Sequence, residues 1–193
     1  MDMLDLIRKR RTIRKYTLDK VPKEVIDAVI EAGRWAPSAH NLQPWKFVVI
    51  ENEEKIQTMA AALERKANEL FSGFNIVIRD TAMNMRNARQ MIAVYSKGTV
   101  TKKFAKFGAP YNEIGNIYEI QSVANAIENM LLYIESAGLG AAVYGMALFC
   151  RSEINKILGQ SDKLMAVISF GYPDENPISP GRKPPGEITE LVR

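Results

Sequence analysis

The chain has 193 residues and a mass of 21.7 kDa, which fits one domain with a single sizeable core. Its 26 basic and 22 acidic residues give a net charge of +4, whereas a nucleic-acid binder normally gathers its basic residues into a dense stripe. The single cysteine, Cys150, excludes an internal disulfide, and the single histidine, His40, excludes a histidine-based metal site. Because no apolar run suits a signal peptide or a membrane span, we expect a cytoplasmic protein.

The first part of the chain alternates helical patterns with one clear strand. A short amphipathic helix is expected to lead into the basic run 8–11, and a second helix to run from 22 to 33, where a glycine ends it. Prolines and small polar residues indicate a loop at 36–44, directly before a strand at 45–50 that is rich in aromatic and β-branched residues. Apolar residues at helical spacing predict a long helix over 53–70.

The second part centres on an apolar helix. A wide apolar stripe predicts this helix over 119–137, and Gly138 follows it as a left-handed stop. The preceding stretch 97–118 contains glycines, a proline and four lysines, and we expect a long irregular excursion or lid there. Residues 74–90 have a mixed pattern that assigns no element.

The remaining elements are short. We expect strands at 91–95, 141–146 and 164–172, a helix at 151–158, and a Pro- and Gly-rich C-terminal extension at 173–193, whose end at 188–192 could add an edge strand. Alternating helices and strands in one layered domain indicate an α+β or α/β fold.

Three separated clusters suit a common kind of ligand. Three arginines and a threonine at 10–14 can bind a phosphate monoester, because guanidinium groups donate two hydrogen bonds at once to its oxygens. Small residues in the loop 37–45 allow the backbone to approach a flat ligand, and its Ser, Asn and Gln side chains can bind the edge of a heterocycle. The tail segment 180–185 is basic again. Taken singly, each cluster also fits an ordinary solvated surface or a turn-rich loop.

In combination and order, four stretches resemble the nitroreductase family of FMN-dependent oxidoreductases. They are RRTIRKY, APSAHNLQPWKFVV, GLGAAVYGM and GRKPP. The resemblance implies an α+β fold with a central, mostly antiparallel sheet flanked by helices, and an intertwined homodimer that binds FMN at the subunit interface. It also implies a ping-pong reaction, in which a hydride from NADH or NADPH reduces the flavin, which then reduces a small-molecule acceptor such as a nitroaromatic or a quinone.

The resemblance further implies which residues hold the phosphate of FMN. These residues are Arg10, Arg11, Thr12, Arg14, Arg182 and Lys183. Thr12 stands in place of the usual serine and keeps the hydroxyl group. A gap of one residue decides between Arg182 and Lys183, and we favour Arg182.

Other positions are matched to the flavin ring. The loop residues that reach it from the partner subunit are Pro37, Ser38, Ala39, Asn41 and Gln43, the strand-end residues beside it are Val143, Tyr144 and Gly145, and the inward residues of the central helix are Ser122 and Asn125. The best-known members carry an acidic residue at the position of Tyr144, which leaves the mode of nicotinamide binding open. The residues that hold the pyrimidine edge also stay open, since 65–68 does not align clearly.

No catalytic side chain and no metal ligand are expected, because electron transfer at flavin N5 is cofactor chemistry. In the lid segment, lysines at 97, 102, 103 and 106 alternate with aromatic residues, a mix that suits a nicotinamide dinucleotide or an aromatic acceptor. Alternatively, the segment is a solvated excursion whose aromatic residues pack on the dimer partner.

Other functions fit the same scaffold. A dehalogenase-like or flavin-cleaving member, or a dedicated oxidase, would share fold and cofactor. A flavin-binding protein without turnover would keep FMN but fail to oxidise NAD(P)H. A nucleic-acid-binding domain that uses the basic run 8–15 is disfavoured, because aromatic and basic residues do not interleave there and no nucleic-acid motif is present.

Overall fold

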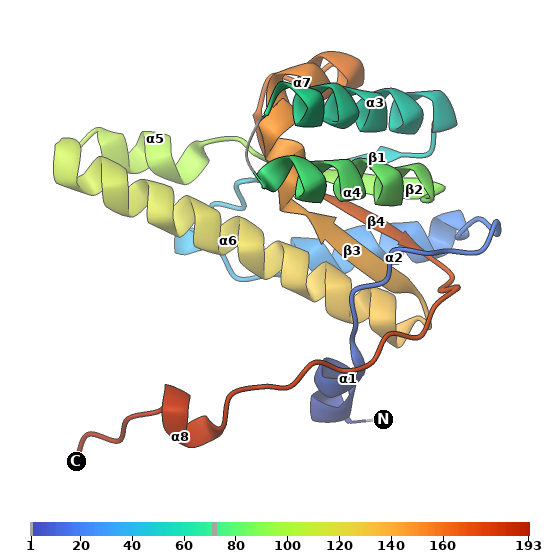
Figure 1. The fold of residues 1–193 in the computed structure, drawn as a ribbon. Coiled ribbons are helices and arrows are strands. Elements are labelled where there is room, and N and C mark those ends of the chain that lie inside the picture. The colour runs from blue at the N-terminus through green and yellow to red at the C-terminus, as the bar shows by residue number, and fades with distance from the viewer. Residues whose placement is uncertain (1, 71–72) are drawn as a thin grey trace.

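The computed structural model describes residues 2–70 and 73–193 (Figure 1). Its strands are β1 (Trp45–Ile50), β2 (Gln90–Ser96), β3 (Gly140–Tyr144) and β4 (Lys163–Gly171). Its helices are α1 (Met3–Lys9), α2 (Lys23–Arg34), α3 (Glu53–Glu69), α4 (Phe74–Arg86), α5 (Thr99–Ala105), α6 (Ala109–Ser136), α7 (Arg151–Leu158) and α8 (Pro185–Ile188), with the 3₁₀ turns η1 (Ala39–Asn41) and η2 (Gly145–Cys150).

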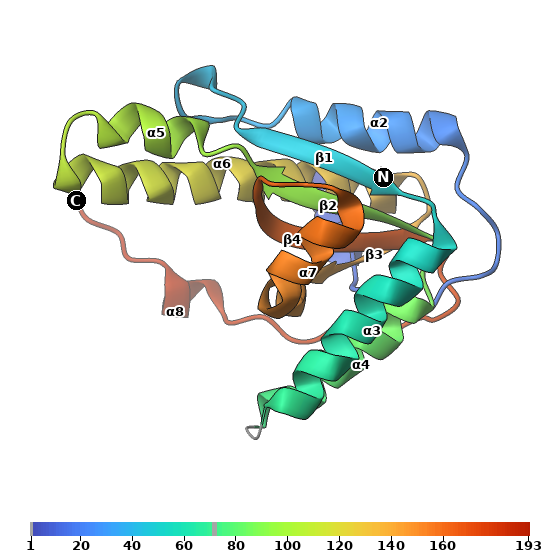
Figure 2. The same ribbon diagram turned by 90° about the horizontal axis from the view of Figure 1, so that it is seen from above.

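The strands form one sheet in the order β1-β2-β4-β3, and every neighbouring pair is antiparallel. The two inner strands are apolar along nearly their whole length, since helices cover both faces of the sheet. One core lies under α3, α4 and α7, and the second lies under α2 and α6 (Figures 1 and 2). The expected α+β fold with an antiparallel sheet between helices is therefore confirmed.

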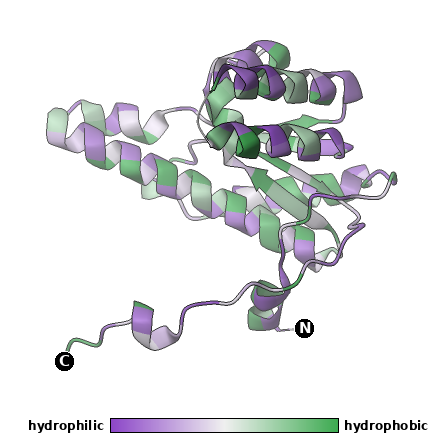
Figure 3. Ribbon diagram, viewed as in Figure 1, coloured by the Kyte–Doolittle hydropathy of each residue, from purple (hydrophilic) through white to green (hydrophobic). Residues whose placement is uncertain are grey.

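Hydropathy follows these layers. Figure 3 shows the strands as mainly hydrophobic, whereas the outer helices carry many hydrophilic residues. Among the described helices, none combines the length and the apolar character that crossing a membrane requires. The predicted strands and the helices at 22–33, 53–70 and 151–158 agree with the structure to within one or two residues, except that β3 ends at Tyr144.

The prediction of an irregular segment at 97–118 is wrong. This stretch forms α5 and the first turns of α6, which begins at Ala109 instead of at 119. Gly108 and Pro110 lie at the start of α6, where both residue types are common. Gly115 lies within α6, and a Cβ atom there would come within 2.7 Å of Phe104 Cβ. The glycines thus mark a helix boundary and a close helix contact, and not a loop.

Two other expectations need correction. The unassigned stretch 74–90 contains α4, a helix whose apolar residues pack on α3. The end of the chain adds no edge strand, because residues 189–193 form no regular element and α8 precedes them. Figure 1 shows the tail leaving the sheet after β4, passing by α1 and then extending away from the body of the molecule.

A buried carboxylate joins α5 to α6. Glu119 is 3% exposed, and its Oε2 atom accepts hydrogen bonds from the amides of Val100 and Thr101 at 2.7 and 3.0 Å. Its other oxygen is hydrogen-bonded to the Ser96 hydroxyl at the end of β2. Glu119 therefore satisfies free amides at the start of α5 and fixes this helix against the sheet.

The segment after α1 lies directly against the sheet and the start of the tail. The Ile13 amide donates to the Ala141 carbonyl at 2.9 Å, and the Thr17 amide donates to the Tyr172 carbonyl at 3.0 Å. Gly140 of β3 pairs with Gly171 of β4 beneath this segment. A Cβ atom at Gly140 would come within 2.5 Å of the Ile13 side chain, so the close approach requires glycine.

We therefore expect Gly140→Ala to push the segment away from the sheet and to lower the free energy of unfolding by about 1–3 kcal/mol, measured by urea denaturation. Gly186→Ala is the matched control, because an added Cβ atom there meets nothing within 4 Å. Equal denaturation midpoints for the two variants would contradict this account of the contact.

Candidate active site

The structure gathers basic residues from both ends of the chain around one cavity. The cavity has a volume of about 310 Å³ and is lined by Arg10, Arg11, Thr12, Arg14, Pro177, Ile178, Pro180 and Arg182. Glu175 holds the two segments together, because its Oε1 atom accepts hydrogen bonds from the amides of Arg14 and Lys15 at 2.5 and 3.2 Å. Segments about 160 positions apart in the sequence are thus fixed side by side.

The four guanidinium groups of this cavity lack acidic partners. Among the ion pairs of the described residues, none includes Arg10, Arg11, Arg14 or Arg182. Arg11 instead donates to the carbonyl oxygens of Arg8 and Arg10. Arg182 does the same toward two carbonyl oxygens of its own tail. Four guanidinium groups outside these ion pairs, around one cavity, suit a phosphate group.

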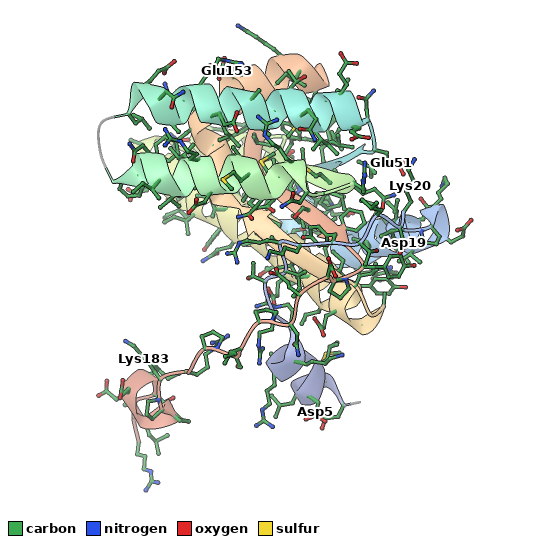
Figure 4. The ribbon with its side chains drawn as sticks, turned by 45° about the vertical axis from the view of Figure 1, so that its right-hand side comes forward. Asp5, Asp19, Lys20, Glu51, Glu153 and Lys183 are labelled. Atoms are coloured by element: carbon green, nitrogen blue, oxygen red, sulfur yellow. The ribbon has the colours of Figure 1, made fainter. Side chains whose placement is uncertain are left out.

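Lys183 is not among the residues that line the arginine cavity, whereas Arg182 is. Figure 4 shows Lys183 on the extended tail, away from the body of the molecule. This placement favours Arg182 as the phosphate ligand within a single chain.

A second cavity adjoins the first. It has a volume of about 530 Å³, and Arg14 lines both. One wall is the end of β3 and the start of η2, formed by Val143, Tyr144, Gly145 and Met146. An added Cβ atom at Gly145 would meet nothing within 4 Å, so the backbone there is open to a ligand. The arginine cluster and the predicted strand-end residues therefore line neighbouring cavities that meet at Arg14.

The side chain of Tyr144 points away from this opening. It is 5% exposed, and its hydroxyl accepts a hydrogen bond from Ser169 Oγ at 3.1 Å. An acidic residue at the same position could interact with a nucleotide, whereas the buried Tyr144 side chain forms its hydrogen bond inside the protein. Only the backbone at Tyr144 is left to contact a ligand.

The opposite wall of the second cavity comes from α4 and was missed by the sequence reasoning. It consists of Val77, Asp80, Thr81, Met83 and Asn84. Asp80 and Asn84 lie four positions apart, so they share one face of the helix. That spacing is the signal that could have identified them, had residues 74–90 been read as a helix.

The loop before β1 forms a third cavity, of about 290 Å³, against α6. Its lining residues are Pro37, Ser38, Ala39, His40, Tyr118, Gln121, Ser122 and Asn125. Three residues of the loop, namely His40, Asn41 and Gln43, have φ angles of 51, 54 and 46°, in the left-handed region that side chains disfavour. Such strained backbone is concentrated at functional sites.

Hydrogen bonds from α6 keep the loop in this conformation. The Ala39 amide donates to Ser122 Oγ at 3.1 Å, and Asn125 Nδ2 donates to the Pro37 carbonyl at 3.3 Å. Ser122 is 2% exposed and also donates to the Tyr118 carbonyl. The Ser122 hydroxyl therefore donates one hydrogen bond and accepts another within the protein, and the accepted bond holds the loop.

The loop cavity and the arginine cavity have no lining residue in common. The chain brings together the first cluster, the tail and the strand end, but it does not bring loop 37–43 to them. Within the described residues, no group of three or more His, Cys, Asp or Glu side chains is placed to hold a metal ion.

The comparisons with known proteins agree with this geometry. The model of the nitroreductase family matches residues 7–172. The chain belongs to the nitroreductase family. This result confirms the resemblance that the sequence motifs carried.

Three similar proteins bear on the chemistry. A putative NADH dehydrogenase/NAD(P)H nitroreductase of Methanothermobacter thermautotrophicus is 29% identical over 181 residues, which cover 92% of this chain and 80% of that protein. An iodotyrosine deiodinase of Thermotoga neapolitana is 26% identical over 178 residues, 91% of each protein. The crystal structure of a putative nitroreductase from Desulfovibrio desulfuricans, in complex with FMN, has a TM-score of 0.75 and 26% identity, covering 100% of this chain and 98% of that one.

The contact of Glu175 with the Arg14 segment can be tested with a matched pair of variants. We expect Glu175→Ala to weaken binding of a phosphate monoester such as phenyl phosphate by about three- to tenfold, because the arginine segment loses its anchor. Glu175→Gln keeps an oxygen acceptor and removes a negative charge, so it should bind the probe at least as tightly as the wild type. Isothermal titration calorimetry measures both affinities, and similar losses in the two variants would refute the anchoring role.

Proposed function

We propose that the protein is an FMN-dependent oxidoreductase that takes electrons from NADH or NADPH and passes them to a small organic acceptor such as a nitroaromatic or a quinone. The observation that carries the proposal is the arginine cavity, which shares the lining residue Arg14 with a second cavity bounded by strand-end backbone. Membership of the nitroreductase family and the similar structure in complex with FMN support it. FMN, when bound, accepts electrons from a reduced nicotinamide and passes them to the second substrate.

The residues present fit the phosphate end of FMN. Arg10, Arg11, Arg14 and Arg182 place four guanidinium groups around one cavity, and Thr12 adds a hydroxyl group. Bidentate hydrogen bonds from guanidinium groups to phosphate oxygens are strong and directional. Lys183 follows Arg182 on the tail but does not line this cavity. In this role the four arginines both bind and orient the cofactor.

The adjoining cavity fits the ring of FMN. The backbone of Val143, Tyr144 and Gly145 would lie along the isoalloxazine, where a main-chain N–H can stabilise negative charge. On the opposite wall, Asp80 and Asn84 offer an acceptor and an amide to the polar pyrimidine edge. We propose these two residues for the pyrimidine edge, which the unaligned segment 65–68 left unassigned.

The loop 37–43 would complete the site from a second copy of the chain. Its residues Pro37, Ser38, Ala39, Asn41 and Gln43, together with Asn125, lie apart from the arginine cavity within one chain. The tail exposes apolar side chains, with Ile178 at 95% and Val192 at 87%, as is typical of a surface that packs on a partner. We therefore propose a homodimer in which each site uses both subunits.

The helical pair formed by α5 and the start of α6 would govern entry to the site. His40 of the loop lies 5.9 Å, between ring centroids, from Phe104 of α5, and Phe104 packs edge-on against Tyr118 of α6. This aromatic surface, with lysines at 97, 102, 103 and 106, suits a nicotinamide dinucleotide or an aromatic acceptor. The lid proposed from the sequence thus becomes a helical one.

A second candidate activity is removal of a halogen from an aromatic substrate. The observation in its favour is the similarity to the iodotyrosine deiodinase of Thermotoga neapolitana over nearly the whole chain. This activity would use the same cofactor cavity, because the fold and the cofactor do not fix the acceptor.

The visible spectrum of the purified protein tests the central proposal. We expect a flavin spectrum that bleaches when NADH or NADPH is added without air, and that returns when a nitroaromatic or a quinone is added. Return with an iodinated tyrosine, but with neither of the other acceptors, would favour the second candidate. Bound flavin that neither nucleotide bleaches would indicate a flavin-binding protein without reductase turnover, and a colourless protein that takes up no FMN would refute the proposal.

The shared site can be tested by mixing two inactive variants. Arg14→Ala removes a residue of the arginine cavity, and Asn41→Ala removes one of the loop. When the two are expressed together, half of the dimers are mixed and each mixed dimer holds one intact site, so activity should recover to about a quarter of the wild-type value. The double variant Arg14→Ala/Asn41→Ala, mixed with the wild type, is the control for dilution. No recovery in the mixture of single variants, despite exchange of subunits, would contradict a site built from two chains.

A further inference from the structure

Three buried hydroxyl groups form a connected network beneath the two adjoining cavities. The hydroxyls of Tyr16 and Ser169 lie 2.8 Å apart in a hydrogen bond, and Ser169 Oγ donates to the Tyr144 hydroxyl at 3.1 Å. The three side chains are 8%, 0% and 5% exposed. Burial of polar groups is costly unless they are hydrogen-bonded, so this cluster is a specific feature of the core.

One end of the network holds the segment that carries the arginines. The Tyr16 hydroxyl shares its proton between Ser169 Oγ and the Ile13 carbonyl, which lies 2.5 Å away, and this contact closes the backbone around Arg14. The Ile13 amide is in turn bound to β3, and the Arg14 amide is bound to Glu175. The backbone of Arg14 is therefore fixed on both sides.

The other end of the network holds the strand end that lines the second cavity. Tyr144 is the last residue of β3 and pairs with Val167 of β4, two positions before Ser169. The side chains of Tyr144 and Ser169 therefore lie on the same face of the sheet. A single serine thus links the arginine segment to the backbone at Gly145.

The two phenols keep their protons. Burial raises the pKa of both Tyr16 and Tyr144, and the negative charge of Glu175 adds to this effect, while the positive charge of Arg14 acts against it. The two hydroxyl groups therefore stay protonated at pH values where an exposed tyrosine begins to ionise.

We propose that Tyr16, Ser169 and Tyr144 are positioning residues for the cofactor, which hold the arginine segment and the strand end in one fixed arrangement. This inference rests on the proposed function, because it assigns the phosphate and the ring of FMN to the two cavities. None of the three hydroxyls needs to contact the cofactor. Their role is to set the separation and orientation of the groups that do, and so to avoid a cost of ordering the site when FMN binds.

Phenylalanine variants test the two tyrosines. We expect Tyr16→Phe and Tyr144→Phe to fold, to bind FMN about three- to tenfold more weakly, and to change the visible circular dichroism of the flavin at saturating FMN. Tyr95→Phe is the matched control, because Tyr95 is also fully buried in the sheet but its hydroxyl has no hydrogen-bond partner among the described residues. It should leave the FMN affinity and the flavin spectrum unchanged.

A pair of nearly isosteric variants tests the serine. Ser169→Thr and Ser169→Val add similar volume at the same buried position, but only threonine keeps the hydroxyl. We expect Ser169→Thr to bind FMN more tightly than Ser169→Val by about three- to tenfold and to keep the wild-type flavin spectrum. A purely structural role would lower the unfolding temperature of the apoprotein without changing the spectrum of the bound flavin.

Failure of the proposed function and failure of the positioning role give different results in these experiments. If the wild type takes up no FMN, the proposed function fails and the inference falls with it. If the wild type binds FMN but Tyr16→Phe and Tyr144→Phe match Tyr95→Phe in affinity and spectrum, the positioning role alone is overturned. Equal FMN affinities for Ser169→Thr and Ser169→Val would overturn it as well.

Discussion

The site depends on one close contact between the N-terminal segment and the sheet. Gly140 and Gly171 pair across β3 and β4, and their missing side chains leave space for Ile13 and Tyr16. This approach permits the hydrogen bond from Ile13 to Ala141, and Glu175 then ties the tail to the same segment. Basic residues from both ends of the chain meet at one cavity for this reason, and a net charge of +4 becomes a local concentration of positive charge.

In the proposed homodimer, one chain carries two separate parts of a site. The arginine cavity and the strand-end cavity share the lining residue Arg14, while the strained loop 37–43 is held on α6. Within the described chain, every hydrogen bond that fixes the loop comes from the loop itself or from α6, which lets it present its backbone outward. Under this proposal, pairing with a second copy gives the protein a larger site than its own fold encloses.

The misread segments share a physical cause. In 97–118, the same residue types fit both a loop and a helix. The sequence does not reveal whether a glycine ends a helix or lets another helix pack closely against it. Gly115 does the second, against Phe104. In 74–90, apolar side chains that pack on α3 are mixed with others that face a cavity, so the periodic pattern is blurred and Asp80 and Asn84 stay hidden.

The sequence by itself determined the strands, most helices, the family motifs and the types of residue that suit a phosphate and a flat ring, because these depend on local periodicity and on side-chain chemistry. Tertiary structure alone decided which groups meet. In the folded chain, Arg182 lines the arginine cavity and Lys183 does not. The Tyr144 side chain is buried in the core, and the Ser122 hydroxyl accepts a hydrogen bond from the loop. These outcomes depend on close approach between segments far apart in the chain, which no local pattern of residues records.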